Sequence, residues 1–336
     1  MVRKYNRKVT IVVGGTFHAP LLAKNLRNLG VLNKVITSMP KFLFNNLDSK
    51  DIVTIPMLTQ ILDLVFKISV PKILIEKDIK LFGTLAARFV KNTDILHGWA
   101  GFSLESGRKI RKENKKFVLE RSCPHILFQE SLLKEEEEKL KIKFKKSSKS
   151  FINRHLKEYE LADKIIVPSK YTYKSFTKYG FSKEKLYKIP LLGKMNILSL
   201  KEINKRKKKN NIFRVGFLGG NMFRKGLIYL LEAWDMLNFK NIELVIKAPE
   251  KQVRKSPIIN KYLNKLKNIR FVGYYKNISD FYLNIDLFCL PSVDDGFGMV
   301  VIEAMAHKVP VIVTKNVGAS EYIENGRHGY NTYKKF

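Results

Sequence analysis

Short apolar runs alternate with amphipathic segments along most of this chain. The first run, Lys8–Val13, is followed by two glycines and by an amphipathic segment, Pro20–Leu29, which Gly30 ends. Asn33–Thr37 then returns to a strand pattern. A strand, a helix and a second strand in this order are typical of a βαβ unit. The chain is therefore predicted to be an α/β protein whose parallel sheet is covered by helices.

The alternation continues through the first half and begins again in the second half. Residues 41–90 have a mainly helical pattern, and Leu132–Lys149 is predicted to be one charged, solvated helix. Lys201–Asn211 contains almost no apolar residue, which is typical of an exposed linker. We therefore predict a first Rossmann-like domain, a basic linker and a second Rossmann-like domain that face each other across a cleft, at 1–195, 196–212 and 213–336.

One passage of the second half, Leu290–Pro310, combines a buried strand end, a glycine loop and a helix. Gly296 and Gly298 enclose Phe297, and Met299–Ala306 follows as a run of good helix formers. The first amides of a helix lack backbone partners, and the helix dipole favours an anion beside them. Two carboxylates of the passage could hold hydroxyl groups of a ligand whose phosphates lie at the glycines: Asp295 and Glu303.

Two further passages of the second half indicate the same ligand. Gly219 and Gly220 open a turn that ends with Arg224 and Lys225, a cationic pair that suits a diphosphate. The spacing is not that of a P-loop, because no GxxxxGK[ST] is present. The strand end at Val272 and Gly273 offers backbone groups to a flat base.

Polar residues also follow the strands of the first half. Glu120, Arg121 and His125 come directly after an apolar run, and the carboxyl ends of parallel strands are where ligands bind. Each could instead anchor a loop. His18 and His97 lie at other strand ends, so the sequence does not decide which histidine lies beside a ligand.

The charge of the chain is extreme, since 63 Lys and Arg residues outnumber 30 Asp and Glu residues to give +33. Such a charge favours nucleic acid, acidic lipid headgroups or a polyanionic substrate, but it also fits the residue bias of an AT-rich genome. No RNA- or DNA-binding signature accompanies the lysines, so no nucleic acid partner is expected.

Neither a metal site nor a membrane span is expected from the sequence. Cys123 and Cys289 form no metal-binding spacing, and Asp294–Asp295 is more typical of a turn than of a metal ligand pair. The most apolar stretch, Met57–Ile75, is interrupted by Asp63, Lys67, Pro71 and Lys72. The amino terminus is charged and does not resemble a secretory signal, so a cytoplasmic protein is expected.

Taken together, the second-half motifs resemble the donor domain of retaining glycosyltransferases of family 4, which have the GT-B fold. The resemblance covers residues 213–330 well and 90–190 more weakly. It is carried by VGFLGGNMFRKGLIYLLEAW, FVGYYKNISDFYLNIDLFCLPS, DDGFGMVVIEAMAHKVPVIVT and VGASEYIENGRHGY, with ERSCPH and EYELADKIIVPSKYTYKSFTKYG in the first half.

The resemblance implies a metal-independent, retaining hexosyltransferase-type enzyme that needs no cofactor beyond its nucleotide-sugar donor. Lys225 and Arg224 would neutralise the diphosphate, Glu303 would bind the ribose, and Asp295 would face the transferred sugar. The backbone of Phe297, Gly298 and Met299 would contact sugar or phosphate, with His125 and Arg121 near the reacting sugar. The acceptor would be a glycan or a lipid-linked molecule in polysaccharide or glycolipid assembly. The basic charge suits an anionic membrane surface, which would place the protein at the inner face of the membrane.

The chain also departs from the family pattern. The family usually has Glu where Asp295 stands, Arg where Gly220 stands and Gly where Lys308 stands. It normally continues with several helices beyond the Asn325–Gly329 turn, so the chain is expected to be truncated at its carboxyl end. An inactive GT-B protein that binds anions or membranes is therefore an alternative, as is another enzyme on the same scaffold, such as a phosphorylase or an epimerase.

Overall fold

The computed structural model describes residues 6–66, 68, 70–143, 147–191, 212–237, 240–273 and 277–332. By its contacts the chain separates into two compact units, which are described one at a time. Unit 1 contains residues 1–130, 145–167 and 176–189, and unit 2 contains residues 131–144, 168–175 and 190–336. The predicted linker, 196–212, lies outside the described residues except for Ile212.

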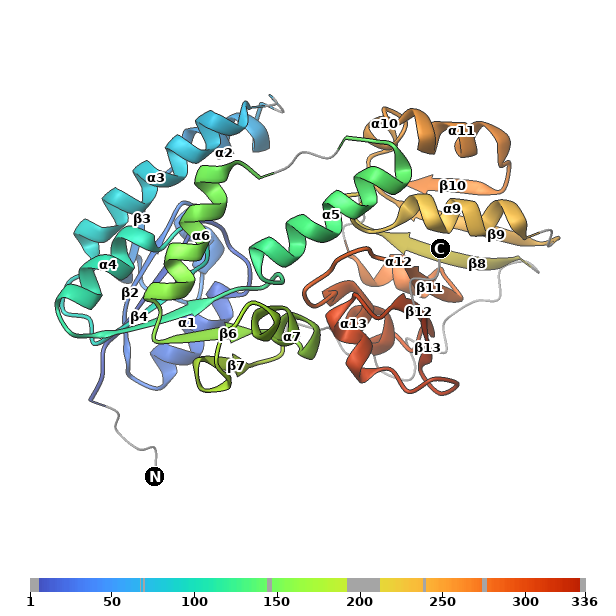
Figure 1. Cartoon of the computed structure of the whole chain (residues 1–336). Helices are drawn as coiled ribbons and strands as arrows, with labels where there is room; N and C mark the ends of the chain where they lie inside the picture. Colours follow the sequence, from blue (N-terminus) through green and yellow to red (C-terminus); the bar gives the residue numbers. More distant parts are fainter. Residues whose placement is uncertain are drawn as a thin grey trace. The chain divides into compact units, whose positions relative to one another are not determined.

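A seven-stranded sheet forms the centre of unit 1, and every neighbouring pair of its strands is parallel. Its strand order is β3-β2-β1-β4-β5-β6-β7, and Figure 1 draws this sheet with β2, β3, β4, β6 and β7 labelled. The strands are β1 (Val9–Val13), β2 (Leu32–Thr37), β3 (Ile52–Thr54), β4 (Ile95–Trp99), β5 (Lys116–Glu120), β6 (Lys164–Val167) and β7 (Leu186–Lys188). All five residues of β1 are buried, as expected for a central strand covered on both faces.

Helices connect these strands in the predicted alternation. They are α1 (Ala19–Asn28), α2 (Leu58–Leu64), α3 (Lys72–Phe89), α4 (Leu104–Lys112), α5 (Ile126–Leu140), α6 (Lys149–Leu161) and α7 (Lys170–Lys178), with the short 3₁₀ helices η1 (Lys41–Phe44), η2 (Ser49–Asp51) and η3 (Lys183–Lys185). Helices α3, α4 and α6 pack side by side in unit 1.

The single charged helix predicted over Leu132–Lys149 is wrong, because α5 ends at Leu140 and α6 begins at Lys149. Lys141 takes a left-handed backbone conformation with a φ of 51°, which a continuing α-helix does not allow. Ser148 then caps α6, since its Oγ accepts a hydrogen bond of 3.1 Å from the Phe151 amide.

Unit 2 is built on a six-stranded parallel sheet in the order β10-β9-β8-β11-β12-β13. Its strands are β8 (Phe213–Leu218), β9 (Ile242–Lys247), β10 (Ile269–Val272), β11 (Leu287–Leu290), β12 (Val311–Thr314) and β13 (Gly329–Thr332). Its later helices are α9 (Leu227–Met236), α10 (Glu250–Val253), α11 (Pro257–Lys265), α12 (Ser279–Leu283), α13 (Met299–Ala306) and the 3₁₀ helix η4 (Gly318–Tyr322).

In both sheets the first strand along the chain lies in the middle, and the strand order reverses beside it. This switch falls between β1 and β4 in unit 1 and between β8 and β11 in unit 2. In open α/β sheets, ligands bind outside the carboxyl ends of the strands at such a switch. We therefore expect the loops after these four strands to carry the binding groups of each unit.

Candidate functional site

The turn after β8 brings a lysine over the glycines that precede it. A Cβ atom on Gly219 would lie 2.8 Å from the Cγ of Lys225, so the lysine stem lies directly against the glycine backbone. Gly226 has a φ of 74° and begins α9, and a Cβ there would lie 1.9 Å from the carbonyl oxygen of Pro291. The end of the turn after β8 is thus pressed against the loop after β11, and the Gly226 position has no room for a larger residue.

Lys225 and Asp295 form an ion pair that joins two motifs 70 residues apart in the sequence. Both side chains are mostly buried, with exposed fractions of 16% and 13%. The backbone of Asp295 is fixed on both sides, since its amide donates to the Asn316 carbonyl at 3.0 Å and its carbonyl accepts from the Gly318 amide at 2.9 Å. The lysine predicted to bind phosphate and the carboxylate predicted to face the sugar are therefore in direct contact.

The glycine loop leads into the amino terminus of α13, as predicted. Gly298 caps the helix with a φ of 82°, a conformation that favours glycine, and Met299 is the first helical residue. Phe297 is buried, and its carbonyl accepts a 2.5 Å hydrogen bond from the Ala319 amide. The Val301 amide donates to the Gly298 carbonyl at 2.9 Å. The Met299 and Val300 amides come before any helical acceptor, so the loop presents donors and a positive dipole end next to Asp295.

Residues 168–175, which belong to unit 2, hold this loop from the other side. The hydroxyls of Ser169 and Thr172 donate to the Gly296 carbonyl at 2.7 Å and 3.0 Å. Asp294 is fully buried and accepts from the Tyr171 hydroxyl at 3.1 Å. In the described part of the chain, no group of three or more His, Cys, Asp or Glu residues could hold a metal ion.

Glu303 is held by a tyrosine that the sequence analysis did not single out. The Tyr282 hydroxyl donates to Oε2 of Glu303 at 2.7 Å, and burial together with the Glu303 charge raises the pKa of Tyr282. The carbonyl of Glu303 contacts Nδ1 of His307 at 2.7 Å. Tyr282 lies within a passage that carries the family resemblance, but no role was assigned to it, and only the contact between α12 and α13 reveals that it fixes the carboxylate.

The remaining predicted donor-binding residues lie at the same carboxyl-terminal edge of the sheet. Val272 ends β10, and a Cβ on the following Gly273 would meet no atom within 4 Å, which is also true of Gly220. Arg224 fixes the turn after β8, because its carbonyl accepts from the Val293 amide at 2.9 Å and its amide donates to Oδ1 of Asn221 at 3.1 Å.

In unit 1 the structure brings Glu120 together with the two histidines at other strand ends. The Nε2 atoms of His18 and His97 lie 2.7 Å and 3.0 Å from the two carboxylate oxygens of Glu120, which is almost fully buried. Burial alone would raise the pKa of Glu120, but the bonds and charges of the two histidines outweigh it and lower that pKa. The rings of both histidines also contact Trp99.

His125 and Arg121 lie in different surroundings. His125 is fully buried and stacks on Tyr179, with the two ring centroids 4.4 Å apart. Burial and the nearby Arg121 charge lower the pKa of His125 from 6.5 to about 4, so its imidazole is neutral at pH 7. Arg121 donates to the Pro124 carbonyl at 3.1 Å and to Oε1 of Gln129 at 3.3 Å. Their predicted position near a reacting sugar stays a prediction.

Comparisons with known proteins bear on both units. Residues 212–335 match the family described as glycosyl transferases group 1. The capsular polysaccharide biosynthesis glycosyltransferase CapM of Staphylococcus aureus is 29% identical over 126 residues, which cover 36% of this chain and 33% of CapM. The matched region thus spans about a third of that relative.

Solved structures with low sequence identity share the fold over nearly the whole chain. Sucrose-phosphate synthase from Thermosynechococcus elongatus aligns with a TM-score of 0.70 and 16% identity, over 98% of this chain and 87% of that one. Anabaena HepE, solved in complex with UDP and glucose, aligns with a TM-score of 0.65 and 16% identity, over 98% and 86%. Residues 212–335 therefore form a glycosyl transferases group 1 domain in a chain that has the GT-B fold.

Proposed function

We propose that this chain is a retaining, hexosyltransferase-type glycosyltransferase that moves a sugar from a nucleotide-diphosphate sugar to a hydroxyl acceptor. The observation that carries the proposal is the Lys225–Asp295 ion pair beside the amino terminus of α13. It places a cation, a carboxylate and a helix dipole within one loop cluster at the switch point of the unit 2 sheet. CapM is named for capsular polysaccharide biosynthesis, and HepE was solved with UDP, which supports this donor class and a role in polysaccharide or glycolipid assembly.

Each group has a distinct task in this reaction. The diphosphate gains negative charge as the bond to the sugar breaks, and Lys225, Arg224 and the first amides of α13 would stabilise that charge without a metal or another cofactor. Asp295 would accept a hydrogen bond from a sugar hydroxyl. Glu303, held at one oxygen by Tyr282, would accept hydrogen bonds from the ribose. We also propose that Arg121 and His125 lie near the transferred sugar.

The acceptor is proposed to be a glycan or a lipid-linked molecule. None of the helices within the described ranges is both long and apolar enough to cross a membrane. From the basic charge of the chain we propose separately that the protein acts at the inner face of the membrane, from the cytoplasm.

Titration calorimetry with UDP and UDP-glucose tests the donor site. Lys225→Met should weaken UDP binding by about 10- to 100-fold, because a hydrogen bond to a charged group contributes about 1.5–3 kcal/mol. Asp295→Asn should reduce turnover because it changes the sugar contact. It should not weaken UDP binding, because Lys225 keeps its charge when its ion-pair partner becomes neutral. Lys251→Met, an exposed lysine on α10, is the matched control and should change neither quantity. Unchanged UDP affinity in Lys225→Met would refute the site assignment.

Three further measurements separate the finer parts of the proposal. The anomeric configuration of the product, read by proton NMR, should match that of the donor if the enzyme is retaining. Activity should survive an excess of EDTA if no metal takes part. If UDP binds at the predicted site but no acceptor yields turnover, the chain is the inactive GT-B binding protein that its departures from the family pattern suggest.

A further inference from the structure

Unit 1 carries an exposed apolar surface around α2 and the first turns of α3. The side chains of Val65, Phe66 and Ile73 have exposed fractions of 67%, 62% and 63%. Exposed apolar side chains that are grouped on neighbouring segments, unlike single scattered ones, mark an interaction site. We call the whole surface the α2–α3 apolar face, and it consists of Leu58, Ile61, Val65, Phe66, Ile68, Ile73, Leu74 and Leu81.

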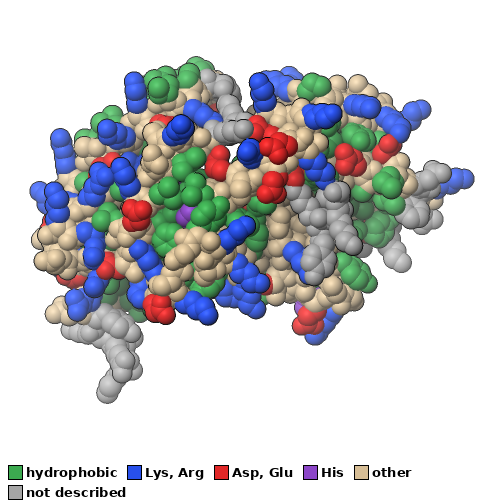
Figure 2. Space-filling view, in the orientation of Figure 1, with side chains coloured by type: hydrophobic (Ala, Val, Ile, Leu, Met, Phe, Trp, Pro, Cys, Tyr) green, Lys and Arg blue, Asp and Glu red, His purple; other side chains and the backbone are tan. Residues whose placement is uncertain are grey.

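Cations lie around this face, and most of the carboxylates near it are hydrogen-bonded to other residues of unit 1. Lys77, Lys80 and Arg88 are exposed on α3. Both acidic residues of α3 are engaged internally, because Asp78 accepts from the amide and hydroxyl of Thr59 at 2.7 Å and Glu76 accepts from Ser150. Asp63 of α2 is the one exposed carboxylate among the described residues between 58 and 89. Figure 2 shows Lys and Arg side chains interspersed with hydrophobic ones in this region.

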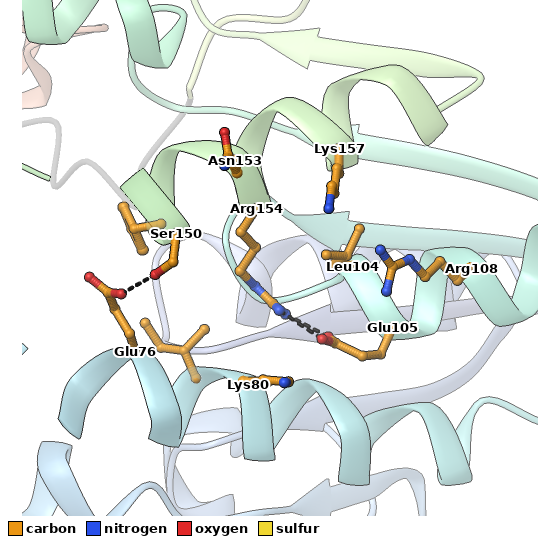
Figure 3. Close-up of a pocket in the computed structure, with 11 residues that line it drawn as sticks. Glu76, Lys80, Leu104, Glu105, Arg108, Ser150, Asn153, Arg154 and Lys157 are labelled. Carbon is orange, nitrogen blue, oxygen red and sulfur yellow. Dashed lines mark hydrogen bonds and ion pairs between the residues drawn. The ribbon is translucent and has the colours of Figure 1, made fainter. Parts of the chain in front are cut away.

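A cavity of about 350 Å³ opens beside this face between α3, α4 and α6. Figure 3 shows Arg154 and Glu105 pointing towards one another, and they form a two-bond ion pair of 2.6 Å and 2.7 Å. Lys80, Arg108 and Lys157 also line the cavity, and no ion pair engages any of the three within the described ranges. With Arg154 and Glu105 paired, these three cations face one further lining carboxylate, Glu76. The cavity therefore keeps a net positive charge, which favours an anionic ligand such as a phosphate group.

A second, smaller cavity connects the two features. It has a volume of about 200 Å³, shares Glu76 and Phe151 with the first cavity, and is also lined by Ile75 of α3. Apolar side chains exposed on a helix, an adjoining apolar cavity and a cation-lined cavity follow each other along α3. This order matches an amphiphile that has an apolar chain and a phosphate head.

We propose that the α2–α3 apolar face docks onto a bilayer of anionic phospholipids, with a lipid phosphate seated among Lys80, Arg108 and Lys157. The apolar side chains would enter the boundary between headgroups and acyl chains, and the lysines and arginines would contact the headgroups. A protein partner fits less well, because lysine is depleted from protein–protein interfaces and exposed lysines lie beside the apolar side chains here. The proposal concerns unit 1 alone and does not depend on the donor site of unit 2.

Vesicle co-sedimentation tests the apolar part of the proposal. The whole chain should bind vesicles of 70% phosphatidylcholine and 30% phosphatidylglycerol more tightly than pure phosphatidylcholine vesicles. The double variant Ile73→Glu and Leu74→Glu should bind the anionic vesicles at least about tenfold more weakly, since both exposed side chains would lose apolar burial and gain charge. Met236→Glu alters a still more exposed apolar residue of unit 2, at 85% exposure, and should bind as the original chain does.

A charge-matched pair of triple variants tests the cavity. Replacing Lys80, Arg108 and Lys157 by Gln should weaken binding by about 100-fold, at about fivefold for each cation near the surface. The control replaces three exposed lysines of unit 2 by Gln and should weaken binding less than about threefold: Lys251, Lys255 and Lys261. Equal losses in the two triple variants would overturn the proposal, because net charge alone would then explain binding.

Two other results would also overturn it. One is an absence of binding to the anionic vesicles. The other result combines two measurements. Inorganic phosphate raises the melting temperature, and Arg108→Gln abolishes that rise but still binds vesicles. The cavity would then be a site for a free anion. UDP binding is measured on every variant as well. A variant that loses vesicle binding but still binds UDP has lost a function of unit 1. A failure of the donor site is a separate outcome, seen as a loss of UDP binding.

Discussion

His125 should make the stability of unit 1 depend on pH in a way that can be measured. Its pKa is about 4 in the folded chain against 6.5 for the unperturbed group, because the ring is buried and Arg121 is near. Between these values the unfolded chain binds a proton that the folded chain does not. The free energy of unfolding is therefore fully retained above pH 6.5 and falls as the pH decreases towards 4.

The size of the effect follows from the two pKa values. At pH 5 the difference in proton binding removes about 2 kcal/mol from the free energy of unfolding, and at pH 4 and below the loss approaches about 3 kcal/mol. His125→Phe removes the titrating group and keeps an aromatic ring against Tyr179. His155, whose pKa is lowered to about 3 by burial and neighbouring charges, titrates in both proteins and cancels from the comparison.

Urea unfolding at pH 7.5 and pH 5.0 provides the measurement. The chain has two tryptophans, so Trp99 fluorescence in a Trp234→Phe background reports on unit 1. Between the two pH values, the protein with His125 should lose about 2 kcal/mol more than the His125→Phe variant. Equal losses in the two proteins would refute the reasoning, because His125 would then be protonated within the fold.

Two substitutions test backbone positions of unit 2. Gly226→Ala should lower the free energy of unfolding by at least about 2 kcal/mol, because its φ is 74° and its Cβ would lie 1.9 Å from the Pro291 carbonyl oxygen. The control Gly220→Ala, whose Cβ meets no atom within 4 Å, should change it by less than about 0.5 kcal/mol. Similar losses in both variants would contradict the geometry. Lys308 has a φ of 55°, so Lys308→Gly should be about 1 kcal/mol more stable than Lys308→Ala, and a calorimetric melting temperature no higher for Gly than for Ala would count against strain at this position.

The sequence predicted the parts of the fold that local chemistry determines. The helix expected at Met299–Ala306 has those bounds in the structure, because Gly298 supplies the left-handed cap that begins it. The position where the family usually has glycine, now Lys308, has the positive φ that explains the preference. The alternation of strands and helices likewise predicted both parallel sheets, since buried parallel strands read as short apolar runs.

Features that depend on distant partners were not predictable. The run of glutamates before Leu140 was expected to be a solvated face, yet Glu136 is 1% exposed and accepts a hydrogen bond from the Tyr229 hydroxyl. Tyr282 was missed for the same reason, because its role depends on Glu303, 21 residues away. The contact of Glu120 with two histidines was also invisible, although each of the three residues was noted at a strand end.

The discontinuity of unit 2 has a consequence for how the chain folds as it is synthesised. Residues 131–144 and 168–175 leave the ribosome long before the strands of unit 2, but they supply the hydroxyls that bind Gly296 and the carboxylate that binds Tyr229. Domains usually fold in order from the amino terminus during translation. Here two early segments must wait for partners made much later, since Glu136 and Tyr229 are 93 residues apart and Ser169 and Gly296 are 127 residues apart. A carboxyl-terminal fragment that begins at residue 213 would lack these segments, so we expect it to fold less stably than unit 2 does in the whole chain.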